Sequence, residues 1–533
     1  MNISGEPWWS QAVIYQIYPR SFFDSNGDGE GDLAGITSKI KYLSSLGIDA
    51  IWLSPFYESP NKDGGYDVSD PRAVDPRFGT ITDFKNLIDT CHQNQIRVIV
   101  DLVPNHFSDQ HKWFQEALNS PSGSAARNRF HFRKTPSGKE LPNNWISLFG
   151  GQVWTKTADG EFYLHLFDQS QPDLNWENSE VREDFEQTLK FWLDHGVDGF
   201  RIDVAHGLVK ENLDTDHHAP QALSDALRLD IAMDSDERSA ILSTVPFFNR
   251  PGVHEVYRRW RKIFDSYERD VVSVAEVWVH PPEEAAKYVR PDELSQVFNF
   301  DLLTTPFEAK SLRHSIESAF SILKPIGALP TWALSNHDSP RVASRIGVQE
   351  SQALFIALLA LPGSLYIYNG QELSLPDAQV ADQYRQDPVF FRTNGEQKGR
   401  DGARVPLPWN SQESEFGFTQ GKPWLPIPQS WQDLSIDKQE EDAASSLHLY
   451  RHALQVRRDL LKNEREIFWR ETGQDGLLVF ERGDLLVLLN TSSEEKFYPV
   501  SGDLLLTSHS GVTADGKIVK LPKATACWVS RLA

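Results

Sequence analysis

The fold is decided by the stretch Gly199-Phe200-Arg201-Ile202-Asp203-Val204-Ala205-His206. Its apolar residues alternate with Arg201 and Asp203, a pattern typical of a buried strand that ends in charge. Burying either charge is costly unless the group is paired or takes part in chemistry. A structural ion pair at the strand end is the alternative interpretation. The stretch therefore indicates a buried strand with a candidate functional cluster at its carboxyl end.

Three further strand-like segments, residues 98–106, 272–276 and 332–338, end in a similar polar cluster. If the strands are parallel, their carboxyl ends converge on one mouth, so the polar residues of all four segments would meet there. These residues are Asp101, Asn105, His106, Arg201, Asp203, His206, Glu276, His337 and Asp338. We leave His206 out of the expected site, because a core histidine hydrogen-bonded to backbone explains it equally well.

Strand-like and helix-like segments alternate along most of the chain, which is typical of βαβ units with parallel strands. The predicted strands span 13–19, 48–55, 98–101, 199–205, 271–277, 297–303, 330–335 and 364–368. Helical spacing of apolar residues falls at 36–46, 81–95, 181–195, 253–267, 312–323, 351–361 and 446–461. An α/β fold of the closed (β/α)8 TIM-barrel type is the economical arrangement, and an open doubly wound sheet is the alternative.

Two long excursions interrupt this alternation, and both follow predicted strand ends, where barrel active sites are built. Residues 105–171, after the third strand, are too many for an ordinary loop and predict a small inserted lobe, domain B. The second excursion, 373–444, lies within the barrel domain A, which comprises 1–104 and 172–460. Residues 461–533 change to short strands split by turns, which predict a C-terminal antiparallel β-sandwich, domain C.

The composition limits which functions are possible. Of the 533 residues, 40% are hydrophobic and 24% charged, which is near the globular average and argues against wholesale disorder. The formal net charge of −22 argues against nucleic-acid binding and fits an enzyme acting on neutral molecules. Cys91 and Cys527 give no disulfide framework, and we find neither a secretory leader nor a membrane-spanning run. We expect a cytoplasmic monomer or homodimer without nucleic-acid or membrane partners.

The loop Asp24–Asp32 carries oxygen-bearing side chains at alternate positions, and its glycines permit sharp turning. Such a loop can wrap a hard cation with carboxylate, amide and backbone oxygens. It is not an EF-hand, because the twelfth position counted from Asp24 is Gly35 and no glutamate closes the cage. A solvated turn stabilised by its own Asp and Asn side chains is the alternative.

The polar cluster at the strand ends limits the chemistry. It contains acids, imidazoles and a guanidinium, but the chain has neither a serine-hydrolase elbow nor a glycine-rich phosphate loop. Glycoside hydrolysis requires one ionised carboxylate as nucleophile and a second carboxyl group that is held protonated to assist the leaving oxygen. The cluster provides both.

Five motifs in order carry a specific resemblance that spans nearly the whole chain. They are Asp101–His106, Gln171–Trp176, Gly199–Asp203, Glu276 after an apolar strand, and Ser335–Asp338. In these motifs the chain resembles the α-amylase superfamily, glycoside hydrolase family 13, and most closely its α-glucosidase and oligo-1,6-glucosidase branch. The resemblance implies that Asp203 is the nucleophile, Glu276 the general acid/base and Asp338 the transition-state stabiliser.

The resemblance also implies a set of substrate-binding residues. Arg201 would keep Asp203 ionised, and Tyr66 would form a platform under the sugar. Arg404 would pair with Asp63, which binds the far hydroxyls and closes the pocket. The full set is Asp63, Tyr66, His106, Phe167, Arg201, His337 and Arg404.

The family's loop cation, Ca²⁺ or Mg²⁺, would be held by Asp24, Asn26, Asp28, the Glu30 carbonyl and Asp32. This site is away from the chemistry, so we assign it to stability. No organic cofactor is expected.

Linkage preference depends on the residues beside the nucleophile. In the relatives, a valine directly after the nucleophile, where this chain has Val204, accompanies cleavage of α-1,6 linkages. The segments Ala205–Gly207 and Arg404–Trp409, by contrast, resemble the sequences of the subgroup that cleaves α-1,4 linkages. We therefore expect a retaining, exo-acting α-glucosidase that acts on small neutral α-glucosides, maltose and short malto-oligosaccharides. The alternatives are an oligo-1,6-glucosidase, a transglucosidase or isomerase on the same scaffold, and a catalytically silent barrel like the heavy subunit of amino-acid transporters.

Overall fold

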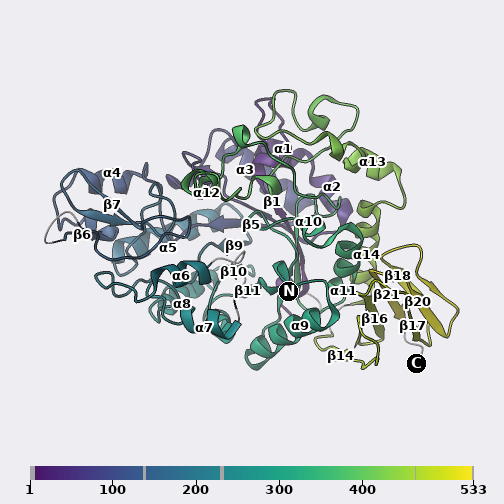
Figure 1. The fold of residues 1–533 in the computed structure, drawn as a ribbon. Helices are drawn as coiled ribbons and strands as arrows, with labels where there is room; N and C mark the ends of the chain where they lie inside the picture. Colours follow the sequence, from purple (N-terminus) through teal and green to yellow (C-terminus); the bar gives the residue numbers. More distant parts are fainter. Residues whose placement is uncertain (1–5, 136–139, 228–232, 234, 462–463, 531–533) are drawn as a thin grey trace.

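The computed structural model describes residues 6–135, 140–227, 233, 235–461 and 464–530. Within these residues, the centre of the molecule is a closed barrel of parallel strands in the order β1-β13-β12-β11-β10-β9-β5-β2 (Figure 1). The strands are β1 (Val13–Ile17), β2 (Ala50–Leu53), β5 (Arg97–Leu102), β9 (Gly199–Ile202), β10 (Val272–Ala275), β11 (Gln296–Asn299), β12 (Thr331–Ala333) and β13 (Ser364–Tyr368). The predicted α/β barrel is confirmed, and the open sheet is excluded.

The barrel strands are buried on both faces, as parallel strands covered by helices must be. Side chains such as Ile14, Trp52 and Tyr366 fill the barrel interior. The register pairs Asp101 on β5 with Arg201 on β9 as direct neighbours. This pairing sets the first contact of the polar cluster at the carboxyl ends of the strands.

Helices surround the barrel (Figure 1), and all of them except Val342–Ile346, which was not predicted, lie where the apolar spacing predicts them. They are α1 (Leu33–Ser38), α2 (Ile40–Leu46), α3 (Ile81–Gln93), α5 (Ser179–Asp194), α8 (Val253–Phe264), α9 (Ala309–Leu323), α10 (Val342–Ile346), α11 (Val348–Leu359) and α14 (Ser446–Leu460). One helix was predicted over 36–46, and this was wrong, because the backbone of Lys39 leaves the helical conformation and separates α1 from α2. The strand predicted over 297–303 is also shorter and gives way to the 3-10 helix Asp301–Leu303.

Four excursions leave the barrel at strand ends. The first, after β2, contains β3 (Tyr57–Glu58) and β4 (Asp70–Val74), and the second, after β5, contains α4 (Lys112–Leu118), β6 (Phe132–Arg133), β7 (Trp154–Lys156) and β8 (Phe162–Leu164). The excursion between β9 and α8, with α6 (Pro220–Ala226) and α7 (Ser235–Leu242), was not predicted as a separate element. The fourth, between β13 and α14, contains α12 (Pro388–Arg392) and α13 (Ile436–Glu441).

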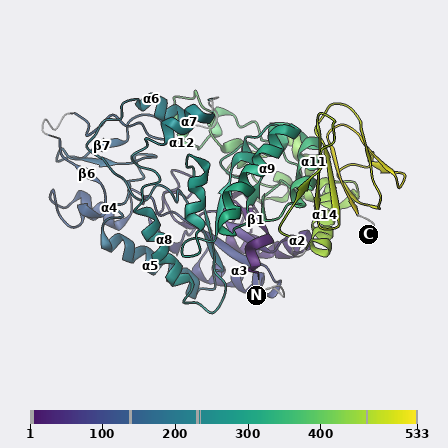
Figure 2. The ribbon, with the colours of Figure 1, turned by 90° about the horizontal axis from the view of Figure 1, so that it is seen from below.

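The C-terminal part forms two antiparallel sheets, at the opposite end of the molecule from β6, β7 and α4 (Figures 1 and 2). One contains β14 (Phe468–Trp469), β15 (Leu477–Arg482), β16 (Leu485–Asn490), β18 (Leu504–Thr507) and β21 (Thr525–Ser530). The other contains β17 (Lys496–Pro499), β19 (Thr513–Ala514) and β20 (Ile518–Leu521). Side chains from both sheets, such as Leu488 and Val519, share one core. In the part of the chain that is described, none of the helices combines the length and apolar character needed to cross a bilayer.

Candidate active site

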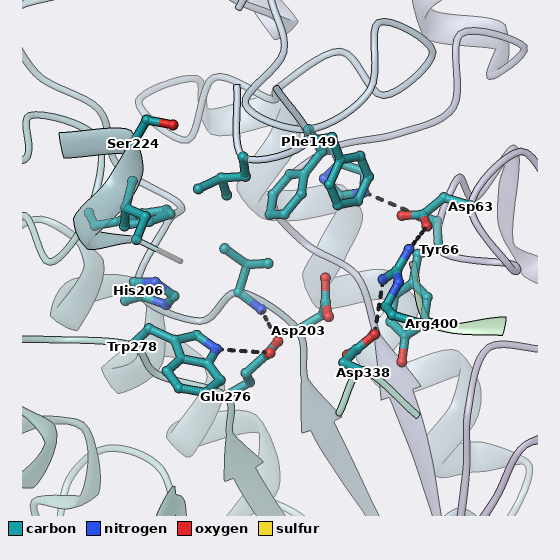
Figure 3. A pocket seen from close by; sticks show the side chains of 16 residues that line it. Asp63, Tyr66, Phe149, Asp203, His206, Ser224, Glu276, Trp278, Asp338 and Arg400 are labelled. Atoms are coloured by element: carbon teal, nitrogen blue, oxygen red, sulfur yellow. Dashed lines mark hydrogen bonds and ion pairs between the residues drawn. The ribbon is translucent and has the colours of Figure 1, made fainter. Parts of the chain in front are cut away.

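A cavity of about 280 Å³ opens at the carboxyl ends of the barrel strands (Figure 3). It is lined by Asp63, Tyr66, His106, Leu148, Phe149, Phe167, Asp203, Val204, His206, Ser224, Leu227, Phe248, Glu276, Trp278, Asp338 and Arg400. The lining combines carboxyl groups, aromatic rings and few other polar groups, which is the usual composition of a small-molecule site.

One guanidinium group organises the acids of the cavity floor. Nη1 of Arg201 lies 2.9 Å from Oδ1 of Asp101 and 2.5 Å from Oδ1 of Asp203. Its Nη2 lies 2.8 Å from Oε2 of Glu276. Because β9 and β10 are neighbouring parallel strands, Asp203 and Glu276, which directly follow them, lie side by side on this guanidinium.

The backbone at Val204 fixes the orientation of Glu276. Val204 has a φ of 44°, a conformation that strains a β-branched residue. In this conformation its N–H donates to Oε2 of Glu276 over 3.0 Å, while the indole N–H of Trp278 donates to Oε1 over 3.2 Å. Both oxygens of the carboxyl group are thereby held in place.

Burial dominates the acid–base properties of this cluster. It raises the pKa of Asp203 well above the usual range, and although Arg201 lowers this pKa as expected, Glu276 and Asp101 raise it further. Burial also raises the pKa of Asp101 to about 6. Because one guanidinium faces three carboxyl groups, the cluster holds a proton to a higher pH than separate carboxyl groups would.

A second ion-pair network closes one end of the cavity. Arg400 donates to Asp63 over 2.7 Å, to Asp338 over 2.9 Å and to Asp387 over 2.7 Å. Burial would raise the pKa of Asp338, but the neighbouring His337, Arg400 and Arg404 lower it well below its usual range.

The predicted partner of Asp63 is corrected by this network. Arg404 was expected to pair with Asp63, but its guanidinium donates to Asp338 and to the carbonyl oxygen of His337. Arg400, four residues earlier, pairs with Asp63 instead. The short 3-10 helix Asp401–Ala403 between the two arginines brings both side chains to the site, which the sequence motif alone did not resolve.

The other expected binding residues surround the same closed end. The ring of Tyr66 stacks on His337 at a centroid distance of 5.2 Å, and its hydroxyl donates to Asp101. His106 is almost fully buried, and burial lowers its pKa to about 4, so the imidazole is neutral. Phe167 contacts the His106 ring at 5.3 Å. Asp63, Tyr66, His106 and Phe167 therefore line the cavity, whereas Arg201, His337 and Arg404 lie behind its lining, in contact with Asp203, Tyr66 and Asp338, respectively.

The opposite end of the cavity contains residues that the sequence analysis did not assign to the site. His206 and Trp278 lie on the far side of Glu276 from Asp63 and Arg400 (Figure 3). Ser224, Leu227 and Phe248 come from the excursion between β9 and α8, whose sequence carries no motif. The only available signal was the length of the segment between strand 199–205 and helix 253–267.

The predicted cation loop folds as a series of turns. Asp24 accepts hydrogen bonds from the backbone N–H groups of Asn26, Gly27 and Gly29, and Asp32 caps α1. Asn26 and Asp28 accept similar bonds, and Glu30 pairs with Arg20. Among the described residues, these acids included, no three His, Cys, Asp or Glu side chains are grouped so as to hold a metal ion. The cation therefore stays a prediction.

Comparison with known proteins decides the family. Residues 16–464 match the family description "Alpha amylase, catalytic domain". The chain belongs to the α-amylase family. Among its relatives in this family, an oligo-1,6-glucosidase of Parageobacillus thermoglucosidasius is 36% identical over 85% of this chain and 84% of the relative. An α-glucosidase of Candida albicans is 35% identical over 85% and 86%, respectively.

Solved structures of the α-amylase family agree with the fold over almost the whole chain. The α-glucosyl transfer enzyme XgtA superimposes with a TM-score of 0.89 at 35% identity, covering 98% of this chain and 100% of XgtA. The trehalulose synthase MutB from Pseudomonas mesoacidophila MX-45 gives a TM-score of 0.88 at 30% identity, covering 99% and 100%. The chain belongs to glycoside hydrolase family 13 and its relatives carry the names of glucosidases, so this protein is an enzyme.

Proposed function

We propose that this protein is a retaining, exo-acting α-glucosidase. It releases glucose from the non-reducing end of maltose and short malto-oligosaccharides, with α-1,4 linkages preferred. The observation that carries the proposal is the placement of Asp203 and Glu276 on adjacent nitrogens of one guanidinium, at the floor of a cavity whose end is closed by Arg400 and its carboxylate partners.

The closed end supports removal of single terminal units. Asp63, Arg400 and Asp338 form a continuous wall of ion pairs, so a glucose unit can enter this end but a longer chain cannot pass through it. Tyr66 offers a ring face to the sugar, and the neutral imidazole of His106 can bind a hydroxyl.

The mechanism follows from the positions of the two floor acids. The ionised carboxylate of Asp203 attacks the anomeric carbon while the carboxylic acid of Glu276 gives its proton to the glycosidic oxygen, which leaves with the bond electrons. Glu276 then takes a proton from water, whose oxygen displaces Asp203 and restores both groups. Asp338, kept ionised by its cations, stabilises the positive charge that develops on the sugar.

Replacement of the nucleophile tests this proposal. Asp203→Asn should lower the turnover of p-nitrophenyl α-glucoside by at least about 1,000-fold, because the covalent step is lost. Asp198→Asn, at the other end of the same strand, is the matched control and should retain activity, since the Asp198 carboxylate pairs with His92, accepts from the backbone N–H of Val98 and does not line the cavity. Proton NMR of the wild-type reaction should show α-glucose as the first product. Initial release of β-glucose would contradict a retaining mechanism.

Transfer of glucose to another sugar is the second candidate function. It is favoured by the similarity of the chain to XgtA and MutB, named as a transfer enzyme and a trehalulose synthase, over nearly the whole length. Both reactions pass through the same covalent intermediate and differ in whether water or a sugar captures it. Initial rates and product chromatography with maltose, isomaltose, sucrose and trehalose separate them: free glucose supports hydrolysis, and isomers or trisaccharides support transfer.

A further inference from the structure

Two aromatic side chains from the excursion after β5 form one wall of the cavity. Phe149 and Phe167 both line it, and their rings pack edge to face with centroids 5.5 Å apart. Phe149 lies across the cavity from Glu276 and Asp338 (Figure 3). We call these two rings the aromatic wall. A glucose unit placed on the floor acids would therefore meet the aromatic wall on its other side.

One guanidinium group holds the backbone beside both rings. Arg392, the last residue of α12, donates from Nε over 3.0 Å and from Nη2 to the carbonyl oxygen of Gly150. Its Nη1 lies 3.1 Å from Oδ2 of Asp168. Gly150 directly follows Phe149 in the chain. Asp168 directly follows Phe167, so a single side chain from another excursion fixes the residue next to each ring.

The contact is largely shielded from water, and the chain turns sharply at it. The side chains of Arg392 and Asp168 are only 19% and 17% exposed. Gly150 and Gly151 have φ values of 89° and 77°, which glycine adopts without strain. A β-carbon at Gly151 would lie 3.3 Å from Nη2 of Arg392, closer than side chains normally pack. The turn is therefore suited to the approach of this guanidinium, and charge-assisted hydrogen bonds of this kind are strong.

The short helix α12 links this contact to the closed end of the cavity. At its start, the carboxylate of Asp387 accepts from the backbone N–H of Val389. Asp387 also pairs with Arg400, which bridges the acids of the closed end. The guanidinium carbon of Arg400 lies 5.4 Å from the ring centroid of Phe149. The closed end and the aromatic wall are therefore held by the same helix, one at each of its ends.

We propose that Arg392 is a positioning residue that holds Phe149 and Phe167 at the distance from the floor acids that a glucose unit needs. It acts through the backbone of Gly150 and through Asp168, and it does not itself line the cavity. Without Arg392 the aromatic wall can move away, so the glucose unit is held less tightly. This inference rests on the proposed α-glucosidase function and names a residue that controls how this site binds the glucose unit.

Arg392→Met tests the proposal, because it removes the guanidinium and keeps most of the apolar stem. KM for maltose and for p-nitrophenyl α-glucoside should rise together, by about 10-fold, since both substrates carry the same glucose unit. The dissociation constant of 1-deoxynojirimycin, a glucose analogue with nitrogen in place of the ring oxygen, should rise by about the same factor in isothermal titration calorimetry. Arg392→Lys, which keeps a charge beside Asp168, should recover part of the loss. Neither KM nor the dissociation constant depends on the folded fraction of a preparation.

The double variant Phe149→Ala/Phe167→Ala shows whether Arg392 acts through the aromatic wall. Adding Arg392→Met to this variant should change KM and the dissociation constant by no more than about 2-fold, because the rings that Arg392 holds are already absent. A further rise of the full 10-fold would mean that Arg392 acts by another route, and it would overturn the proposal.

Arg269→Met provides the matched control. Arg269 is also partly buried and donates to the carbonyl oxygens of Leu193 and Val197, but it does not line the cavity. Its replacement should lower stability and leave KM and the dissociation constant unchanged. Unchanged values in Arg392→Met would overturn the role of Arg392. A wild-type enzyme that binds 1-deoxynojirimycin but releases no glucose from either substrate would instead overturn the proposed function, while calorimetry would still decide the role of Arg392.

Discussion

The two ends of the cavity are built from opposite kinds of side chain. The closed end is formed by paired charges, with Arg400 bridging Asp63, Asp338 and Asp387. The other end is formed mainly by apolar side chains such as Leu227 and Phe248. The closed end comes from motif-bearing strand ends and the excursion between β13 and α14, whereas the other end draws on the excursion between β9 and α8, which has no motif.

The difference between the two ends indicates which part of the substrate is held in one orientation and which part can vary. A rigid, fully paired network can hold one sugar in one orientation, because each hydroxyl meets a group of fixed position. An apolar surface with few polar groups constrains its occupant less. Relatives with the same fold carry the names of hydrolases, a transfer enzyme and a synthase, which fits a shared glucose site and a variable partner site.

The largest effect should come from the acid that stands between the two ends. Glu276→Gln should lower kcat/KM for maltose by about 100- to 10,000-fold, because the sugar oxygen then leaves without a proton. An aryl glucoside with a strongly acidic leaving group, such as 2,4-dinitrophenyl α-glucoside, needs less protonation and should lose less. Steady-state kinetics on both substrates measures this. Equal losses would contradict the assignment of Glu276 as the proton donor.

The closed end should respond equally to both kinds of substrate. Arg400→Ala leaves Asp63, Asp338 and Asp387 without their shared cation and misplaces the glucose unit. We expect kcat/KM to fall by about 100-fold for maltose and for p-nitrophenyl α-glucoside alike. Lys398→Ala, which removes an exposed ion pair with Asp382 in the same excursion, should stay near wild type. If Arg400→Ala lowered kcat/KM for maltose alone, the two ends of the cavity would not differ in the way described.

The smallest effect concerns stability rather than rate. Burial raises the pKa of Asp63 to about 6 from an ordinary value of 3.8. The protonated carboxyl group of Asp63 contributes its full stability to the fold below pH 3.8. This contribution, about 3 kcal/mol, is lost as the pH rises through about 6. Asp63→Asn should therefore gain stability relative to wild type between pH 4.5 and 7.5, by about 2 kcal/mol. Denaturant unfolding at the two pH values measures this gain.

Asp168→Asn provides a control of opposite sign. Burial would raise the pKa of Asp168, but hydrogen bonds from Ser170 and the charge of Arg392 lower it overall. Its ionised form therefore stabilises the fold above the ordinary pKa, and this contribution is lost as pH falls through the lowered value. The asparagine variant should be less stable than wild type at pH 7.5. If the free energy of unfolding relative to wild type changed in the same direction in Asp63→Asn and Asp168→Asn, charge at the closed end would not control stability.

The sequence predicted those parts of the site that local patterns encode. Apolar strands that end in charge located Asp203, Glu276 and Asp338, because parallel strands bring their carboxyl ends together whatever the helices between them are. The break at Lys39 was missed, because the apolar spacing of 36–46 continues across it. Arg404 was assigned to Asp63 by the resemblance alone, and Arg400 was not considered. Both arginines flank the same short helical turn, and only side-chain placement shows that Arg400 reaches Asp63.

By itself, the sequence determined the barrel, the family resemblance and the acids of the floor, because strand periodicity and ordered motifs are local properties of the chain. The tertiary structure alone decided that one guanidinium serves three carboxyl groups and that Arg400 closes the cavity. These features depend on distances between residues up to 337 positions apart in the chain, as in the Arg400–Asp63 pair. Folding sets such distances, and no local pattern records them.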